Sequence, residues 1–307
     1  MKILIVCNPT AGHGRGAREI SEIQTLCHGL GLGLETDVRT TASRGHATEI
    51  VAAANLHDYD AVVAAGGDGT VFETVTGLFR NPAGAAVPLG VMPLGTGNSF
   101  ARDLGLDRKR LAEAASVIAA GNTRKVDVAR VRSADEEFHY LNILGVGFPS
   151  DVAVVAERFK MLGSAAYTVG VVLRTAFLKT FNLRLELDGL ALEREATFVE
   201  ISNSRYTADF LMAPEARVDD GVLDVTVLGR ISRRRLLQLF PTVFRGEHIH
   251  YQEVETFRAR RITVSAEHPM VLSPDGELVG TTPVEISCRH RALEVFAPQL
   301  RPMSVPP

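Results

Sequence analysis

A glycine-rich turn that contains one carboxylate, Gly66-Gly67-Asp68-Gly69-Thr70, is the pattern best suited to chemistry in this sequence. The apolar run at residues 60–65 is typical of a buried parallel strand, and residues 71–79 carry apolar side chains at helical spacing. Glycines let the backbone approach a ligand closely, and a helix N-terminus offers unpaired N–H groups to an anion. The turn is therefore predicted to hold a phosphate with Asp68 at its edge, although a simple tight turn would carry the same letters.

Two further glycine-rich turns follow apolar runs, at residues 8–16 (NPTAGHGRG) and 93–97 (PLGTG). The first lacks the G-K-[S/T] of a Walker A loop and the G-x-G-x-x-G spacing of a dinucleotide-binding turn. In the second, Asn98 or Ser99 could cap the helix that follows, and Thr96 offers a hydroxyl to a ligand. Each turn alone is weak evidence for nucleotide binding.

A third pattern lies far along the chain, at Ser273-Pro274-Asp275-Gly276-Glu277. Asp-Gly is typical of a tight hairpin turn, which alone would explain both acids. Two carboxylates that flank a glycine can also place one acid against a ligand as a general base. The sequence leaves open which of Asp275 and Glu277 would take the proton.

The elements that must position these residues alternate between strand and helix over the first 128 residues. Such alternation predicts a doubly wound parallel sheet with helices on both faces, and ligands bind such sheets beyond the carboxyl ends of the strands. All the glycine-rich turns of this region fall at those ends. Strands are expected at residues 2–7, 34–39, 60–65 and 88–92, and helices at 17–30, 45–55, 71–79 and 103–120.

The rest of the chain favours an antiparallel second domain, a sandwich or a barrel. Its strands are separated by turns such as Asp188-Gly189, and two helical stretches, residues 150–177 and the arginine-rich 232–244, interrupt them. A short strand at 293–298 could return to the first domain, and the tail at 301–307 is expected to be disordered. The expected strands are residues 126–131, 140–147, 183–187, 197–202, 222–228, 262–265 and 284–288.

Composition excludes several classes of protein. A net charge of −3 argues against a general nucleic-acid binder. The three cysteines have no metal-ligand spacing, which fits a reducing cytosol, and His248 and His250 are expected to be surface residues rather than metal ligands. Neither a signal peptide nor a membrane-spanning segment is expected, because the long uncharged stretches are interrupted by prolines or are too short.

Six segments together resemble the bacterial diacylglycerol kinase-like lipid kinases, the superfamily that also holds ceramide and sphingosine kinases. They are NPTAG at 8–12, GGDGT at 66–70, PLGTGNSFARDLG at 93–105, KVDVAR at 125–130, DDGVLDV at 219–225 and DGE at 275–277. The resemblance implies an α/β chain with a Rossmann-like nucleotide domain of the NAD kinase and phosphofructokinase type at residues 1–128. A mainly antiparallel β-sandwich domain would follow at 129–290, with a strand within 290–300 returning to the first domain.

The resemblance also implies roles for individual residues. Asp68 and Asp127 match acids that organise magnesium and water near the phosphates, and Asp275 and Glu277 match the pair from which the general base is drawn. A second, structural Mg²⁺ site would use the Asp220 side chain and the carbonyls of Arg217 and Val222. The residues implied to bind ATP are Asn8, Pro9, Thr10, Ala11, Gly12, Thr41, Gly66, Gly67, Asp68, Gly69, Thr70, Val71, Phe72, Glu73, Thr96 and Asp127.

The function expected from this resemblance is transfer of the γ-phosphoryl group of ATP to a lipid hydroxyl, with Mg²⁺ and with diacylglycerol as the first candidate acceptor. An NAD kinase and a non-catalytic nucleotide or lipid sensor remain as alternatives on the same fold. The apolar stretch 148–181 could line an acyl pocket or form ordinary core, and the basic segment 230–245 could contact a membrane or be a solvated face. A cytoplasmic, peripherally membrane-associated protein is expected, with a homodimer left open.

Overall fold

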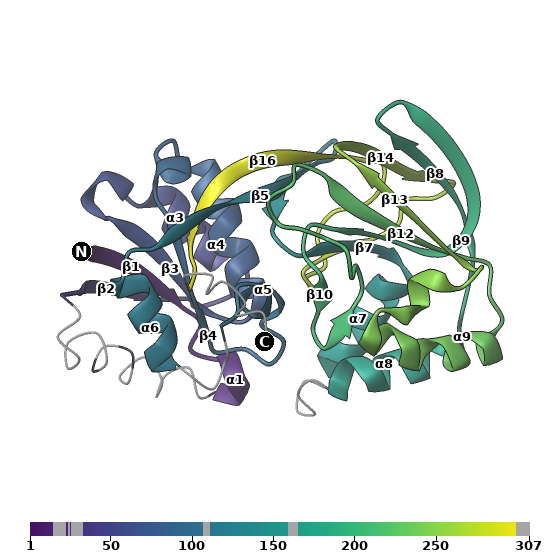
Figure 1. Cartoon of the computed structure of the whole chain (residues 1–307), viewed down its shortest axis with the longest axis horizontal. Coiled ribbons are helices and arrows are strands. Elements are labelled where there is room, and N and C mark those ends of the chain that lie inside the picture. The colour runs from purple at the N-terminus through teal and green to yellow at the C-terminus, as the bar shows by residue number, and fades with distance from the viewer. Residues whose placement is uncertain (15–22, 24, 26–32, 107–110, 159–164, 299–307) are drawn as a thin grey trace, which may run out of the picture.

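The computed structural model describes residues 1–14, 23, 25, 33–106, 111–158 and 165–298 of the 307-residue chain. The helix predicted at 17–30 and the tail at 301–307 lie essentially outside the described residues. Figure 1 shows two lobes side by side, joined across the top by long strands.

The first lobe is built on a parallel sheet in the order β4-β3-β1-β2. Buried apolar clusters cover both faces of this sheet, as a doubly wound fold requires. The strands are β1 (Lys2–Cys7), β2 (Glu35–Thr40), β3 (Ala61–Gly66) and β4 (Leu89–Pro93). The helices are α1 (Ala11–Gly14), α3 (His46–Ala53), α4 (Asp68–Arg80), α5 (Ser99–Asp103) and α6 (Leu111–Ala119), with 3₁₀ turns at Leu56–Asp58 and Gly84–Ala86.

The helix predicted over 103–120 is wrong at its N-terminal end. Helix α5 ends at Asp103, residues 104–106 are not helical, and the described part of α6 spans Leu111–Ala119. Between them Gly105 has φ +80°, a left-handed conformation that ends a helix and that glycine adopts without strain.

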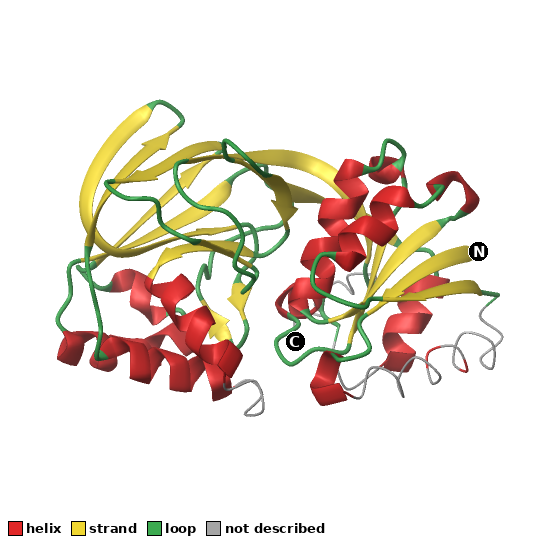
Figure 2. Ribbon diagram, turned by 180° about the vertical axis from the view of Figure 1, so that it is seen from behind, coloured by secondary structure: helices red, strands yellow, loops and turns green. Residues whose placement is uncertain are grey.

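Two long strands join the lobes (Figures 1 and 2). Strand β5 (Thr123–Arg132) pairs with β16 (Val284–Phe296) along most of its length. Strand β16 also pairs with β14 (Arg261–Ala266) of the second lobe. At Val295 it pairs in parallel with Leu89 of β4. The strands expected separately at 284–288 and 293–298 are thus one strand, which bulges between Arg289 and Leu293.

The second lobe is a β-sandwich-like layer pair with a buried apolar interior, which confirms the predicted fold class. Strand β8 shows the expected alternation, with Leu183, Leu185 and Leu187 buried and the residues between them exposed. Its strands are β6 (Glu137–Tyr140), β7 (Ile143–Gly147), β8 (Phe181–Leu187), β9 (Leu190–Ser202), β12 (Leu223–Gly229), β13 (Val254–Ala259), β14 (Arg261–Ala266) and β15 (Leu272–Pro274), with the small pair β10 (Tyr206–Thr207) and β11 (Phe210–Leu211).

Helices α7 (Phe148–Arg158), α8 (Ala165–Thr175) and α9 (Arg233–Leu239) lie together below the sandwich in Figure 1. The single helix predicted over 232–244 instead changes to a 3₁₀ helix, Phe240–Arg245, where Pro241 removes a backbone donor. His248, predicted to be a surface residue, is buried in the following 3₁₀ helix (Glu247–His250) with Nε2 3.0 Å from the Met212 carbonyl. Within the described residues, no helix combines the length and apolar character that a membrane span requires.

Candidate active site

The carboxyl ends of the parallel strands gather the glycine-rich turns at one edge of the sheet. The backbone N–H of Asn8 donates to the Ala65 carbonyl at 3.0 Å, which ties the turn after β1 to the end of β3. The N–H of Leu94 donates to the Gly66 carbonyl at 2.9 Å, which ties the turn after β4 to the same place. Segments far apart in the sequence therefore meet where a ligand of a doubly wound sheet is expected.

Two glycines in these turns are required by close packing. A Cβ on Gly95 would lie only 2.4 Å from Cα of Gly67, and a Cβ on Gly97 would lie 2.7 Å from Oδ2 of Asp68. The turns after β3 and β4 can approach each other this closely only without side chains. Their backbone N–H groups and the N-terminus of α4 consequently share one small region.

Asp68, the first residue of α4, is half-buried and caps helix α5. Its Oδ1 accepts the N–H of Ser99 at 2.7 Å, and its Oδ2 accepts the Ser99 hydroxyl at 3.3 Å. Nδ2 of Asn142, from the second lobe, lies 3.5 Å from the same Oδ1. Burial raises the pKa of Asp68, although the hydrogen bonds from Ser99 oppose this rise. A cation beside Asp68 would offset the cost of burying its charge.

The region where the two lobes meet, marked by the contacts Asn142–Asp68 and Arg44–Glu277, is called the cleft. Asp275 belongs to the second lobe and lies on the turn that follows β15. The residue has φ +47° and is followed by Gly276 at φ +83°, the paired left-handed conformation typical of Asp-Gly turns. Its Oδ1 accepts the N–H of Ile143 at 3.0 Å, whereas its Oδ2 is buried without a hydrogen-bond partner among the described residues. Burial, with a further contribution from the negative charge of Asp68, raises the pKa of Asp275 to about 8.

Glu277, two residues later, lies directly against the glycine-rich turn after β3 in the first lobe. A Cβ on Gly69 would be 2.3 Å from Oε1 of Glu277. Its other oxygen, Oε2, forms an ion pair of 2.8 Å with Nη2 of Arg44, which also donates to the Leu278 carbonyl at 3.0 Å. Arg44 belongs to the first lobe, so this ion pair crosses the cleft. The structure therefore places Glu277 against Gly69, in the first turn of α4.

The other predicted ATP-binding residues are distributed over several elements of the first lobe. Thr41 is held beside the first turn, because its N–H donates to the Cys7 carbonyl at 2.8 Å. The Glu73 carboxylate caps α3 by accepting the N–H groups of Gly45 at 2.7 Å and Ala47 at 3.1 Å. The side chains of Thr70, Val71 and Phe72 are buried, whereas Asn8, Pro9, Thr10, Gly67, Gly69 and Thr96 retain exposed surface in the turns and Ala11, Gly12 and Gly66 are buried there.

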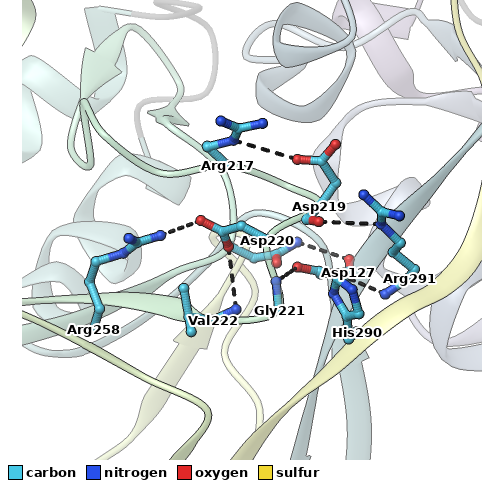
Figure 3. Close-up of polar contacts among 10 residues, drawn as sticks. Asp127, Arg217, Asp219, Asp220, Gly221, Val222, Arg258, His290 and Arg291 are labelled. Atoms are coloured by element: carbon cyan, nitrogen blue, oxygen red, sulfur yellow. Dashed lines mark hydrogen bonds and ion pairs between the residues drawn. The ribbon is translucent and has the colours of Figure 1, made fainter.

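Asp127 lies apart from these turns, in the strand β5 that joins the lobes (Figure 3). Its side chain is fully buried. Oδ1 accepts the N–H of Arg291 at 2.6 Å and lies 2.9 Å from Nδ1 of His290, and Oδ2 accepts the N–H of Gly221 at 2.6 Å. The carboxylate thus fixes the bulge of β16 to the loop before β12, and both of its oxygens are occupied by donors from the protein.

The predicted structural metal site lies in the same loop (Figure 3). Oδ2 of Asp220 forms an ion pair with Arg258, and Oδ1 accepts the N–H of Val222 at 3.3 Å. Arg217 extends to the other aspartate of the loop, with Nε 3.7 Å from Oδ1 of Asp219. Over the described part of the chain, no three His, Cys, Asp or Glu side chains converge closely enough to hold a metal ion.

Comparison with known proteins follows the two lobes. The profile of the diacylglycerol kinase catalytic domain matches residues 2–131, and that of the YegS C-terminal NAD kinase beta sandwich-like domain matches residues 142–297. A Mycobacterium tuberculosis protein named diacylglycerol kinase is 33% identical over 304 residues, with 97% of this chain and 96% of that protein covered. The chain belongs to the diacylglycerol kinase-like lipid kinase family.

Other members and relatives of the family agree with this assignment. A Bacillus subtilis protein named diacylglycerol kinase is 30% identical over 298 residues and is covered, like this chain, to 96%. A Bacillus anthracis crystal structure described as a candidate diacylglycerol kinase superposes with a TM-score of 0.77 at 27% identity, covering 97% of both chains. An Archaeoglobus fulgidus NAD kinase at 14% identity and a TM-score of 0.54 shares the fold alone.

Three residues of this diacylglycerol kinase-family site were missed by reasoning from sequence. The sequence indicates Ser99 only as a possible helix cap. In the structure its N–H and its hydroxyl both donate to Asp68. Arg44 lies inside the segment that contains Thr41, but nothing in the sequence indicated that it reaches Glu277 across the cleft. Asn142 carries no motif at all, because its approach to Asp68 depends on how the second lobe docks.

Proposed function

We propose that this chain is an ATP- and Mg²⁺-dependent lipid kinase that transfers the γ-phosphoryl group of ATP to the hydroxyl of diacylglycerol. The observation that carries the proposal is the position of Glu277. The carboxylate of Glu277, from the second lobe, lies against Gly69 at the N-terminus of α4 in the first lobe. A helix N-terminus is suited to binding phosphate. An acceptor hydroxyl placed there would have both its proton acceptor and the phosphoryl group within reach.

The proposed roles follow from the contacts. The turns at residues 8–12 and 66–70 hold the phosphates through backbone N–H groups, as the glycine contacts allow. Glu277 takes the proton of the lipid hydroxyl while the hydroxyl oxygen bonds to the γ-phosphorus of ATP. The bond between that phosphorus and ADP breaks, and ADP leaves. Arg44 holds Glu277 in place, because the ion pair of 2.8 Å fixes one carboxylate oxygen while the other lies against Gly69. Without a bound cation, burial raises the pKa of Asp275 to about 8, so that it keeps its proton at neutral pH and is the weaker candidate base.

The cleft residues also fit a catalytic Mg²⁺. The half-buried Asp68 has a raised pKa, and the nearby Asp275 has a buried oxygen without a partner among the described residues. A cation would offset the cost of burying these carboxylates, and Mg²⁺ needs only one or two carboxylates beside water and phosphate oxygens. When bound, the ion would neutralise charge on the phosphates. Asp127 is not proposed as a ligand, because its oxygens are already occupied.

A division of the chain accompanies this function. We place the boundary between the nucleotide lobe and the lipid lobe near residue 128, with the end of β16 returning to the first lobe. The parallel pairing of Val295 with Leu89 supports this return. The matched family regions, 2–131 and 142–297, support the boundary.

The lipid would be reached through the helical layer of the second lobe, in a cytoplasmic enzyme that touches the membrane peripherally. Helix α8 packs against both α7 and α9, and Asp151 of α7 pairs with Arg174 of α8 at 2.7 Å. Arg235 of α9 pairs with Glu253 at 2.7 Å. The exposed arginines of this helix are therefore Arg233 and Arg234. The large apolar side chains exposed on these helices and beside them are Val154, Val172, Leu173, Phe177, Leu237 and Phe244.

One assay tests the proposal. Purified protein is offered γ-labelled ATP and Mg²⁺ with diacylglycerol, ceramide, sphingosine or NAD, each lipid in mixed micelles. Label is expected in phosphatidic acid, the product of diacylglycerol. Transfer to NAD alone would make the chain an NAD kinase, and transfer to no acceptor would favour a sensor on the same fold.

A further inference from the structure

The loop before β12 and the start of that strand bring together two carboxylates, Asp220 and Asp224. In the antiparallel register of β12 with β13, Asp224 lies directly opposite Arg258. Directly opposed residues project from the same face of a sheet. Arg258 is therefore held by its strand position beside Asp224. Its guanidinium extends to Asp220 of the loop (Figure 3).

The guanidinium of Arg258 contacts both acids. Its Nη2 forms an ion pair with Oδ2 of Asp220, and its Nε lies 3.5 Å from Oδ1 of Asp224. The two carboxylate side chains are only 20% and 14% exposed, whereas the Arg258 side chain is 49% exposed, so the acids are largely shielded from solvent and the guanidinium is not. The second oxygen of Asp220 accepts the N–H of Val222. Each oxygen of Asp220 thus has a donor from the protein.

We propose that Arg258 is the resident cation of this loop and excludes the structural Mg²⁺ that the family resemblance implies at Arg217, Asp220 and Val222. Mg²⁺ requires oxygen ligands at ~2.0–2.1 Å in octahedral geometry, and Asp220 is the one carboxylate assigned to it here. To take that carboxylate, the ion would have to displace a guanidinium that never loses its charge in proteins. The inference is independent of the proposed reaction, because all of these residues lie outside the cleft.

A resident guanidinium makes the folded loop independent of divalent cations. The same loop gives the N–H of Gly221 to Asp127, and the Val218 carbonyl accepts the N–H of Asp127 at 2.6 Å. Arg258 therefore stabilises, without metal, the loop that is bonded to the strand connecting the two lobes.

Thermal unfolding of the full chain without nucleotide tests this inference. Wild-type protein stripped with EDTA is expected to keep its Tm when millimolar Mg²⁺ is returned. Arg258→Met, which keeps most of the side-chain volume but removes the charge, is expected to lower Tm by about 2–4 °C. In this variant Mg²⁺ should restore part of the loss, because the two acids then lack a cation. The matched control Arg217→Met removes an exposed arginine of the same loop and should leave both the Tm and its response to Mg²⁺ unchanged.

Asp220→Asn separates this loop from any other magnesium site. A rise of the wild-type Tm with Mg²⁺ that disappears in Asp220→Asn would overturn the inference, whereas a rise that persists in Asp220→Asn arises elsewhere and leaves it standing. Arg258→Lys provides a second reading should Arg258→Met fail to fold, since it keeps a positive charge. It should resemble wild type in its indifference to EDTA, and a Tm that depends on Mg²⁺ in this variant would count against Arg258 as the resident cation.

Discussion

The acids of the cleft and the acids of the connecting region look alike in the sequence and differ in the structure. Asp127 and Asp220 lie where the lobes are joined, and each of their carboxylate oxygens accepts a donor from the protein. In the cleft, Asp275 keeps a buried oxygen without a partner among the described residues, and Glu277 lies against bare glycine backbone. Acids that the fold has already paired stabilise it, and acids that face an open backbone edge are suited to a substrate.

This difference separates two consequences of losing an acid. An acid of the connecting region should affect stability first, because its removal leaves buried N–H groups without acceptors. Glu277 in the cleft should affect turnover first, because it lies against Gly69 and its ion pair with Arg44 is half exposed. Variants of either region test this difference, and Glu277→Gln is expected to have the largest effect.

Glu277→Gln is expected to lower kcat by ~10²–10⁴ while the Tm stays close to that of wild type. The amide keeps the shape of the side chain but cannot accept the lipid proton. The KM for ATP should change little, because the glycine turns of the other lobe hold the phosphates. Steady-state kinetics with diacylglycerol measures this, with the exposed Glu186→Gln as the matched control. A loss of less than tenfold would move the base to another residue.

Asp127→Asn is expected to destabilise the fold by about 2–4 kcal/mol. The carboxylate accepts from Gly221, His290 and Arg291, whereas the amide would point its own N–H groups at one of these donors. Denaturant unfolding measures the loss, with the exposed Asp135→Asn as the control. A variant of normal stability that binds ATP poorly would return Asp127 to the nucleotide site.

The sequence predicted the parallel sheet, the β-rich second domain and the family, because buried runs, glycine turns and their order are local signals. It could not separate Asp127, inside a strand, from Asp68, just after one, because each is a single aspartate in a segment that resembles the family. What distinguishes them is the bulge of β16, which comes from a segment more than 160 residues away and brings the Arg291 N–H to Asp127. Contacts that cross the cleft, such as the one between Arg44 and Glu277, depend on how the lobes dock and leave no local pattern.

Asp275→Asn should change the pH dependence of stability in the cleft. The unfolded aspartate ionises near pH 4, whereas burial raises the pKa of native Asp275 to about 8. The native state therefore holds a proton that the unfolded state has lost between these values, and the contribution of Asp275 to stability falls as pH rises through this range. The asparagine removes this slope. The Tm of the variant minus the Tm of wild type should therefore increase from pH 5 to pH 8, as measured by calorimetry.

Asp188→Asn is the control of opposite sign. Hydrogen bonds from the N–H groups of Arg260 and Arg261 lower the pKa of Asp188, so its contribution is present at neutral pH and is lost in acid as pH falls through that lowered pKa. This variant should be less stable than wild type near pH 7 and approach it at low pH. Parallel profiles for Asp188→Asn and Asp275→Asn would contradict the assignment of a raised pKa to Asp275.

Arg44→Met is expected to have the smallest effect and compares the two arginine–carboxylate pairs directly. Arg44 pairs with Glu277 across the cleft with half of its side chain exposed, and exposed ion pairs contribute little to stability, so the Tm should not change. Turnover should fall by about three- to tenfold, or roughly 0.7–1.4 kcal/mol of barrier, because Glu277 is then less firmly held. Arg44→Lys, which keeps the positive charge, should recover part of the loss. A fall in Tm with unchanged kinetics would show that Arg44, like Arg258, only stabilises the fold, and the distinction between the two regions would then fail at this pair.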